Sequence, residues 1–125
     1  MAPAELAGLE TWIRSASLPG PHLEVGTAAG GTLCFLQKQY PPATRPAFVV
    51  VDTMTYFLDQ FETIKRNLRA HDLDPEQTDF RVMNSSEAFA AASARGERFD
   101  FILVDASHKI RYMMDDLRWL RLLNT

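Results

Sequence analysis

The sequence predicts an α/β fold in which a doubly wound parallel sheet stops after its fourth strand and the helix that follows. Short apolar runs alternate four times with segments of helical periodicity, an order that is typical of βαβ units. The runs at 47–52 and 99–105 are apolar without alternation, as expected of strands that are covered on both faces. A glycine-rich turn at 26–31 connects the first strand to a helix and completes the pattern.

Each element follows from the local pattern, because apolar residues spaced three and four apart predict helices and proline or glycine bounds them. In the first half we expect a helix over 4–16, a strand over 22–25, a helix carrying Leu33, Leu36 and Tyr40 that stops at Pro41, and a strand over 47–52.

The second half predicts two further strands, each followed by a helix. A long helix should carry Phe57, Phe61, Ile64 and Leu68, before a strand over 79–83 and a helix over 87–95 with Ser85 and Ser86 as N-cap candidates. After a strand over 99–105, the last helix should bury one face made of Ile110, Met113 or Met114, Leu117 and Leu120, with the methionines as core filler.

Length, charge and cysteine content narrow the class of protein. The 125 residues fit one domain, with an N-terminal helix within 1–19 and a βα core over 20–125. The net charge of -3 argues against nucleic-acid and membrane partners, which usually select a basic excess. Cys34 is the single cysteine, so it forms no internal disulfide and should pack in the core. The lack of a signal peptide or membrane-spanning run predicts a cytoplasmic protein.

Polar residues stand where the predicted strands end, which is where open parallel sheets bind ligands. The acids are Glu24, Asp52 and Asp105, and Asn84 with Ser85 follows the third strand. A carboxylate such as Asp52 can accept hydrogen bonds from both hydroxyls of a ribose. The alternative is that Asp52 is the N-cap of the next helix, and the glycine turn upstream favours the ribose.

The glycine spacing separates the possible cofactors. A nicotinamide or flavin fingerprint reads G-x-G-x-x-G, whereas this turn has Gly26 and Gly30 with Ala28 between them. A Walker-type phosphate loop needs a lysine that this turn lacks. Glu24 would repel a pyrophosphate but could accept hydrogen bonds from an ammonium group. These residues favour a nucleoside that carries an amino acid.

Three motifs resemble those of class I S-adenosylmethionine-dependent methyltransferases, in particular the small-molecule and sugar O-methyltransferase-like subgroup. They are Glu24-x-Gly26-x-x-x-Gly30, Val49-Val50-Val51-Asp52, and the run 99–108, which is similar to F-D-x-I-x-x-D-G-x-H. The resemblance covers residues 20 to 124 and implies a Rossmann-like fold and S-adenosyl-L-methionine as cofactor. Asn84-Ser85, where the family often has Gly-Asp, and Ala106, where the subgroup usually has Gly, depart from the pattern.

The resemblance also implies a set of cofactor-binding residues. The turn at Gly26, Thr27, Ala28 and Gly30 would hold the methionine part, and Glu24 would face its amino group. Asp52, with Thr53 beside it, would bind the ribose, Met54 would cover the adenine, and Asn84, Ser85 and Ser86 would contact the edge of the adenine.

Asp105 and His108 are the candidates for the reacting end of the site. His108 could act as a general base, because the ordinary pKa of a histidine suits proton removal from a hydroxyl near neutral pH. The alternative, of equal weight, is that His108 is a polar loop residue at a helix start. By the resemblance, Asp105 is also a candidate cofactor-binding residue, and it would either bind a divalent metal such as Mg²⁺ or lie beside the acceptor. The family takes the other metal ligands from later strands.

The family's fifth strand normally covers the fourth, so 99–104 would form a bare sheet edge here. This edge predicts either a missing C-terminal segment or a homo-oligomer. The sequence thus predicts a methyltransferase acting on an oxygen of a small molecule. The alternatives are a non-catalytic truncated module and, less favoured, a nicotinamide-dependent oxidoreductase domain.

Overall fold

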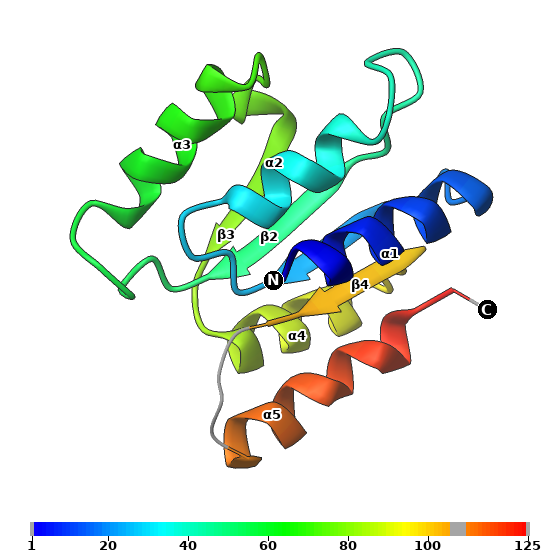
Figure 1. Cartoon of the computed structure of the whole chain (residues 1–125). Coiled ribbons are helices and arrows are strands. Elements are labelled where there is room, and N and C mark those ends of the chain that lie inside the picture. Colours follow the sequence, from blue (N-terminus) through cyan, green and yellow to red (C-terminus); the bar gives the residue numbers. More distant parts are fainter. Residues whose placement is uncertain (1, 106–109, 125) are drawn as a thin grey trace.

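A four-stranded parallel sheet with strand order β3-β2-β1-β4 forms the centre of the molecule (Figure 1). This computed structural model describes residues 2–105 and 110–124. The strands are β1 (His22–Val25), β2 (Phe48–Asp52), β3 (Thr78–Val82) and β4 (Phe101–Val104). The chain first adds strands on one side of β1 and then places β4 on the other side. Such a reversal opens a crevice at the carboxyl ends of the strands.

Helices cover both faces of this sheet, which confirms the predicted doubly wound architecture (Figure 1). One face carries α1 (Pro3–Ser15), α2 (Gly31–Lys38) and α3 (Gln60–Ala70). The other face carries α4 (Ser85–Ala94) and α5 (Ile110–Asp116), which continues as the 3-10 helix η2 (Leu117–Leu122). A short 3-10 helix, η1 (Pro75–Gln77), precedes β3.

The strand β2 contributes to the apolar core on each face of the sheet. Phe48 and Val50 pack with α1, α2 and α3, whereas Val49 and Val51 pack with α4 and Trp119. All four are buried, which explains why the run shows no alternation. Cys34 is buried on the α2 side, as predicted for a packing residue.

Two helix starts differ from the expected ones. The helix α3 begins at Gln60, so Phe57 lies in the preceding segment and is 37% exposed. The N-cap of α4 is Asn84, whose side chain accepts a hydrogen bond from the Glu87 N–H at 2.8 Å. Ser85 and Ser86 were the wrong candidates, because both lie inside the helix.

The predicted buried face of the last helix is also wrong. Met113 and Met114 are 47% and 63% exposed, and Leu117 and Leu120 are exposed as well. The side chains of this segment that are buried among those described are Asp116, Trp119 and Leu122, whereas the side chain of Ile110 lies outside the description. From Leu117 onward the segment is a 3-10 helix, which has three residues per turn and turns a different set of side chains inward than the expected α-helix would.

The fourth strand is shorter than the apolar run that predicts it. Phe99 lies outside β4 and forms a parallel bridge with Leu123. The Asp100 carboxylate accepts a hydrogen bond from the Gly20 N–H, which fastens the entry of β4 to the entry of β1. Within the described residues, no helix has the length and apolar character needed to cross a membrane.

Candidate functional site

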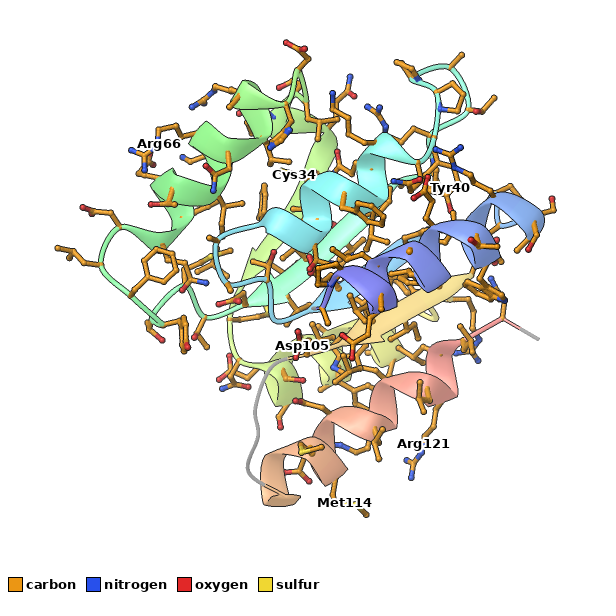
Figure 2. The ribbon with its side chains drawn as sticks, in the orientation of Figure 1. Cys34, Tyr40, Arg66, Asp105, Met114 and Arg121 are labelled. Carbon is orange, nitrogen blue, oxygen red and sulfur yellow. The ribbon has the colours of Figure 1, made fainter. Side chains whose placement is uncertain are left out.

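A cavity of about 520 Å³ opens at the carboxyl ends of the strands, where the topology predicts a ligand. It lies between the turn after β1, the segment after β2 and the residues that follow β3 and β4, among them Asp105, which is labelled in Figure 2. The lining residues are Gly26, Thr27, Ala28, Val51, Asp52, Thr53, Thr55, Tyr56, Met83, Ser85 and Asp105.

The glycine turn takes its shape from three residues in the left-handed region. Gly26 and Gly30 have φ of 85° and 87°, and Ala28 adopts a φ of 46° although it carries a Cβ. Gly30 is the N-cap of α2, and the first helical hydrogen bond runs from the Cys34 N–H to its carbonyl. The first-turn N–H groups of α2 therefore have no acceptor within the helix and favour an anionic group.

The carboxylate of Asp52 connects two segments of the cavity wall. Its Oδ2 accepts a hydrogen bond from the Thr27 N–H at 2.9 Å, and its Oδ1 accepts one from the Met54 N–H at 2.7 Å. Asp52 is not a helix N-cap, because α3 begins only at Gln60. A carboxylate has about four lone-pair sites, so these two bonds leave it able to accept hydroxyl groups.

Glu24 is a buried carboxyl group with one unpaired oxygen. Its side chain is 3% exposed, and neither its Oε2 nor the Thr27 Oγ1 has a hydrogen-bond partner among the described residues. Burial raises the pKa of Glu24 to about 8, and the negative charges of Asp105 and Asp52 act in the same direction. The Thr27 hydroxyl is close enough to lower this pKa somewhat, although it forms no hydrogen bond of acceptable geometry. Buried polar atoms are normally paired, so the unpaired Oε2 marks Glu24 as a candidate binding group, although its side chain is not among those that line the cavity.

Thr53, expected beside the ribose, and Met54, expected over the adenine, differ in where the structure places them. Thr53 lines the cavity, but Met54 does not, because its side chain packs against the core beneath α2 and α3. The methionine on the cavity wall is Met83, directly after β3. Met83 could have been predicted, because ligands in open parallel sheets lie at the strand ends. Tyr56 also lines the cavity, but no feature of the sequence pattern indicates it.

Of the three residues Asn84, Ser85 and Ser86, only Ser85 lines the cavity. The Asn84 side chain caps α4, and the Ser86 Oγ accepts a hydrogen bond from Arg118 at 3.1 Å. The Ser85 Oγ accepts one from the Trp119 Nε1 at 2.8 Å. This turn thus joins the cavity wall to the C-terminal segment.

Asp105 lines the cavity and is exposed at its mouth, directly after β4. His108 and Ala106 lie outside the described residues. Within residues 2–105 and 110–124, no three His, Cys, Asp or Glu side chains are grouped so that they could hold a metal ion. The described residues therefore do not fit a metal centre at Asp105, which would need several oxygen ligands.

A doubly wound parallel sheet with a glycine turn after its first strand and an acid at the end of the second defines a Rossmann-like domain. Residues 23–124 match a family model described as a methyltransferase domain. Because this match spans most of the chain, the protein belongs to that methyltransferase domain family.

Solved structures of methyltransferases share this fold. The O-methyltransferase from Bacillus cereus in complex with SAH has a TM-score of 0.74 at 17% identity, with 99% of this chain and 53% of that chain covered. TomG from Streptomyces achromogenes, an O-methyltransferase involved in tomaymycin synthesis and solved with SAM, has a TM-score of 0.75 at 18% identity, with 99% and 52% covered. A SAM-dependent methyltransferase from Agrobacterium tumefaciens has a TM-score of 0.64 at 17% identity, with 82% and 30% covered.

This chain spans about half the length of the first two of these structures. No curated protein matches the chain. At such low identities the structural likeness establishes the fold, and the family match establishes the family.

Proposed function

We propose that this chain is the cofactor-binding part of an S-adenosylmethionine-dependent methyltransferase that acts on an oxygen of a small molecule. The observation that carries this proposal is the unpaired, buried Oε2 of Glu24, two residues before the first glycine of the turn and close enough to Asp52 and Asp105 for their charges to raise its pKa. The family match supports the reaction class. The neighbours solved with SAH and with SAM support the cofactor.

The described residues fit the parts of this cofactor. Glu24 would accept hydrogen bonds from the amino group, and the N–H groups at the start of α2 would face the carboxylate. Asp52 would accept hydrogen bonds from the ribose hydroxyls. Met83, Tyr56 and Ser85 offer apolar and polar surface to the base. When bound, the cofactor supplies an electrophilic methyl group on a sulfonium.

For the acceptor end, Asp105 is the described residue that we assign to the mouth of the site. In our proposal His108 removes the proton of the acceptor hydroxyl, because the ordinary pKa of a histidine suits that step near neutral pH.

We further propose that the chain works in the cytoplasm. The strand β4 is an outer strand of the sheet, and we propose that either a C-terminal segment or a second copy of the chain covers its edge.

Calorimetric titration with S-adenosylhomocysteine tests the proposal. Micromolar binding to the wild-type chain, lost or strongly weakened in Asp52→Ala, would support it. Asp115→Ala is the matched control, because this exposed aspartate does not line the cavity. NADH serves as the competing cofactor. Binding of NADH instead, or no binding by a folded protein, would contradict the proposal.

A further inference from the structure

One face of α3 lies against the glycine turn and contacts three consecutive residues of it. Gln60, Ile64 and Asn67 are spaced i, i+4 and i+7, so they share this face. The Gln60 Nε2 donates a hydrogen bond to the Ala28 carbonyl at 3.0 Å, and the Asn67 Nδ2 donates one to the Ala29 carbonyl at 2.8 Å. Between them, the Ile64 Cγ2 lies 3.2 Å from the position that a Cβ on residue 30 would take. Figure 1 shows α3 beside α2, the helix that the turn begins.

Gln60 makes a second contact that Asn67 lacks. Its Oε1 accepts a hydrogen bond from the Tyr56 N–H at 2.9 Å. The side chain is 1% exposed, and both ends of its amide are therefore paired in a buried position. Through this one residue the turn after β1 is joined to the segment after β2. Ala28 and Tyr56 both line the cavity, whereas Gln60 does not.

The contact with Ala28 fixes a strained peptide. Ala28 has a φ of 46°, and an L residue in this region costs about 1 kcal/mol, so neighbours must hold it there. A trans peptide directs its C=O and N–H in opposite directions. Because the Ala28 carbonyl points to Gln60, the Ala29 N–H points away from α3.

We propose that Gln60 is a positioning residue that joins the glycine turn to the segment after β2 and thereby sets the affinity of the cavity for the cofactor. It acts through Ala28 and Tyr56 and does not touch the ligand. The binding test of this proposal rests on the proposed function. The structural test uses the ligand-free protein and does not depend on that function.

Gln60→Leu removes both hydrogen bonds and keeps the size of the side chain. Gln37→Leu is the matched control, since Gln37 is also buried and donates a hydrogen bond to the Thr78 Oγ1 at 2.7 Å, outside the cavity. We expect both variants to lower the melting temperature. Only Gln60→Leu should weaken the binding of S-adenosylhomocysteine, by about tenfold, because a purely structural loss would affect both alike.

Amide hydrogen exchange of the ligand-free protein gives the second readout. The Tyr56 amide should exchange about tenfold faster in Gln60→Leu and at the wild-type rate in Gln37→Leu. If Gln60→Leu does not fold, Gln60→Met removes the same two hydrogen bonds with an unbranched side chain of similar length, and it should give the same loss of affinity and the same faster exchange of Tyr56.

Each outcome decides the question. Unchanged affinity and unchanged Tyr56 exchange in a folded Gln60→Leu would overturn the positioning role. If the wild-type chain binds no S-adenosylhomocysteine, the proposed function fails, and the exchange rate of Tyr56 alone then shows whether Gln60 holds the two segments together.

Discussion

The Asp52 Oδ2 accepts a hydrogen bond from the Thr27 N–H at 2.9 Å, and this bond fastens the end of β2 to the turn after β1. The other oxygen of the same carboxylate holds the Met54 N–H. Asp52 therefore shapes two walls of the cavity before any ligand arrives. The role of Asp52 in the fold and the role that we propose for it in binding therefore depend on the same side chain.

Replacing Asp52 by Asn should weaken both stability and binding. An amide can accept on one side only, so its NH₂ would face the N–H of Thr27 or of Met54. We expect a loss of about 1–3 kcal/mol in the free energy of unfolding, measured by urea denaturation, and a large loss of affinity for S-adenosylhomocysteine. An Asn variant with wild-type stability and affinity would show that neither hydrogen bond matters.

The stability of the ligand-free protein should depend on the protonation of Glu24. Its pKa is raised from 4.5 to about 8, so between these values the folded state holds a proton that the unfolded state has released. The free energy of unfolding should thus fall by a few kcal/mol as the pH rises through this window. In Glu24→Gln this part of the pH dependence should vanish, which denaturation at several pH values would reveal. An identical profile in the two proteins would refute the raised pKa.

Ligand binding should release the same proton. An ammonium group beside Glu24 stabilises the ionised form, so at pH 7 the carboxyl should lose its proton when the cofactor binds. Calorimetry in buffers of different ionisation enthalpy should detect nearly one proton released per ligand. Glu24→Gln should release none, and affinity of the wild-type chain should rise with pH toward about 8.

Two adjacent glycines should respond in opposite ways to alanine. Gly30 has a φ of 87° and its added Cβ would lie 3.2 Å from Ile64, so Gly30→Ala should cost about 1–3 kcal/mol of stability. Gly31 begins α2, and no atom lies within 4 Å of its added Cβ. Gly31→Ala should be neutral or stabilise by about 0.5–1 kcal/mol. Thermal unfolding of the two single variants measures this difference. Equal effects would contradict the left-handed conformation of Gly30 and its close approach to Ile64.

The exposed apolar face of the C-terminal segment should promote self-association. Leu117 and Leu120 are 49% and 48% exposed, and they follow the exposed Met113 on the same segment. We expect the double variant Leu117→Lys, Leu120→Lys to lower the average mass in sedimentation at tens of micromolar. Leu58→Lys is the control, because Leu58 is 89% exposed in the segment before α3. A monomeric wild-type chain would contradict this expectation.

Much of the fold was predictable because periodicity reports burial directly. Most of the apolar run at 47–52 forms a strand that is covered on both faces. The acids Glu24, Asp52 and Asp105 lie at the carboxyl ends of the strands, close enough for their charges to interact. Which residues of Leu117–Leu122 are buried was not predictable, because a 3-10 segment changes the period without changing the composition.

The candidate site likewise contains residues that local sequence patterns predict and residues that they do not. The positions of Glu24 and Asp52 at the ends of β1 and β2 were predictable, because strand ends and glycine spacing are local signals, while their roles in binding stay predictions. Met54 was predicted to cover the adenine, but its side chain packs against the core. Its backbone has a φ of 59°, a conformation that no sequence pattern indicates for a methionine. Gln60 was missed because a polar residue at a helix start looks solvent-facing in the sequence, whereas this one is 1% exposed.

The bond between the Trp119 indole and Ser85 gives the molecule an optical property. Of the two tryptophans, Trp12 is 50% exposed, whereas Trp119 is fully buried and donates to a residue on the cavity wall. Indole emission responds to the polarity and hydrogen bonding around the ring. A Trp12→Phe protein would therefore emit from a single indole that lies one side chain away from the cavity, so its emission should report whether the cavity is occupied without any added label.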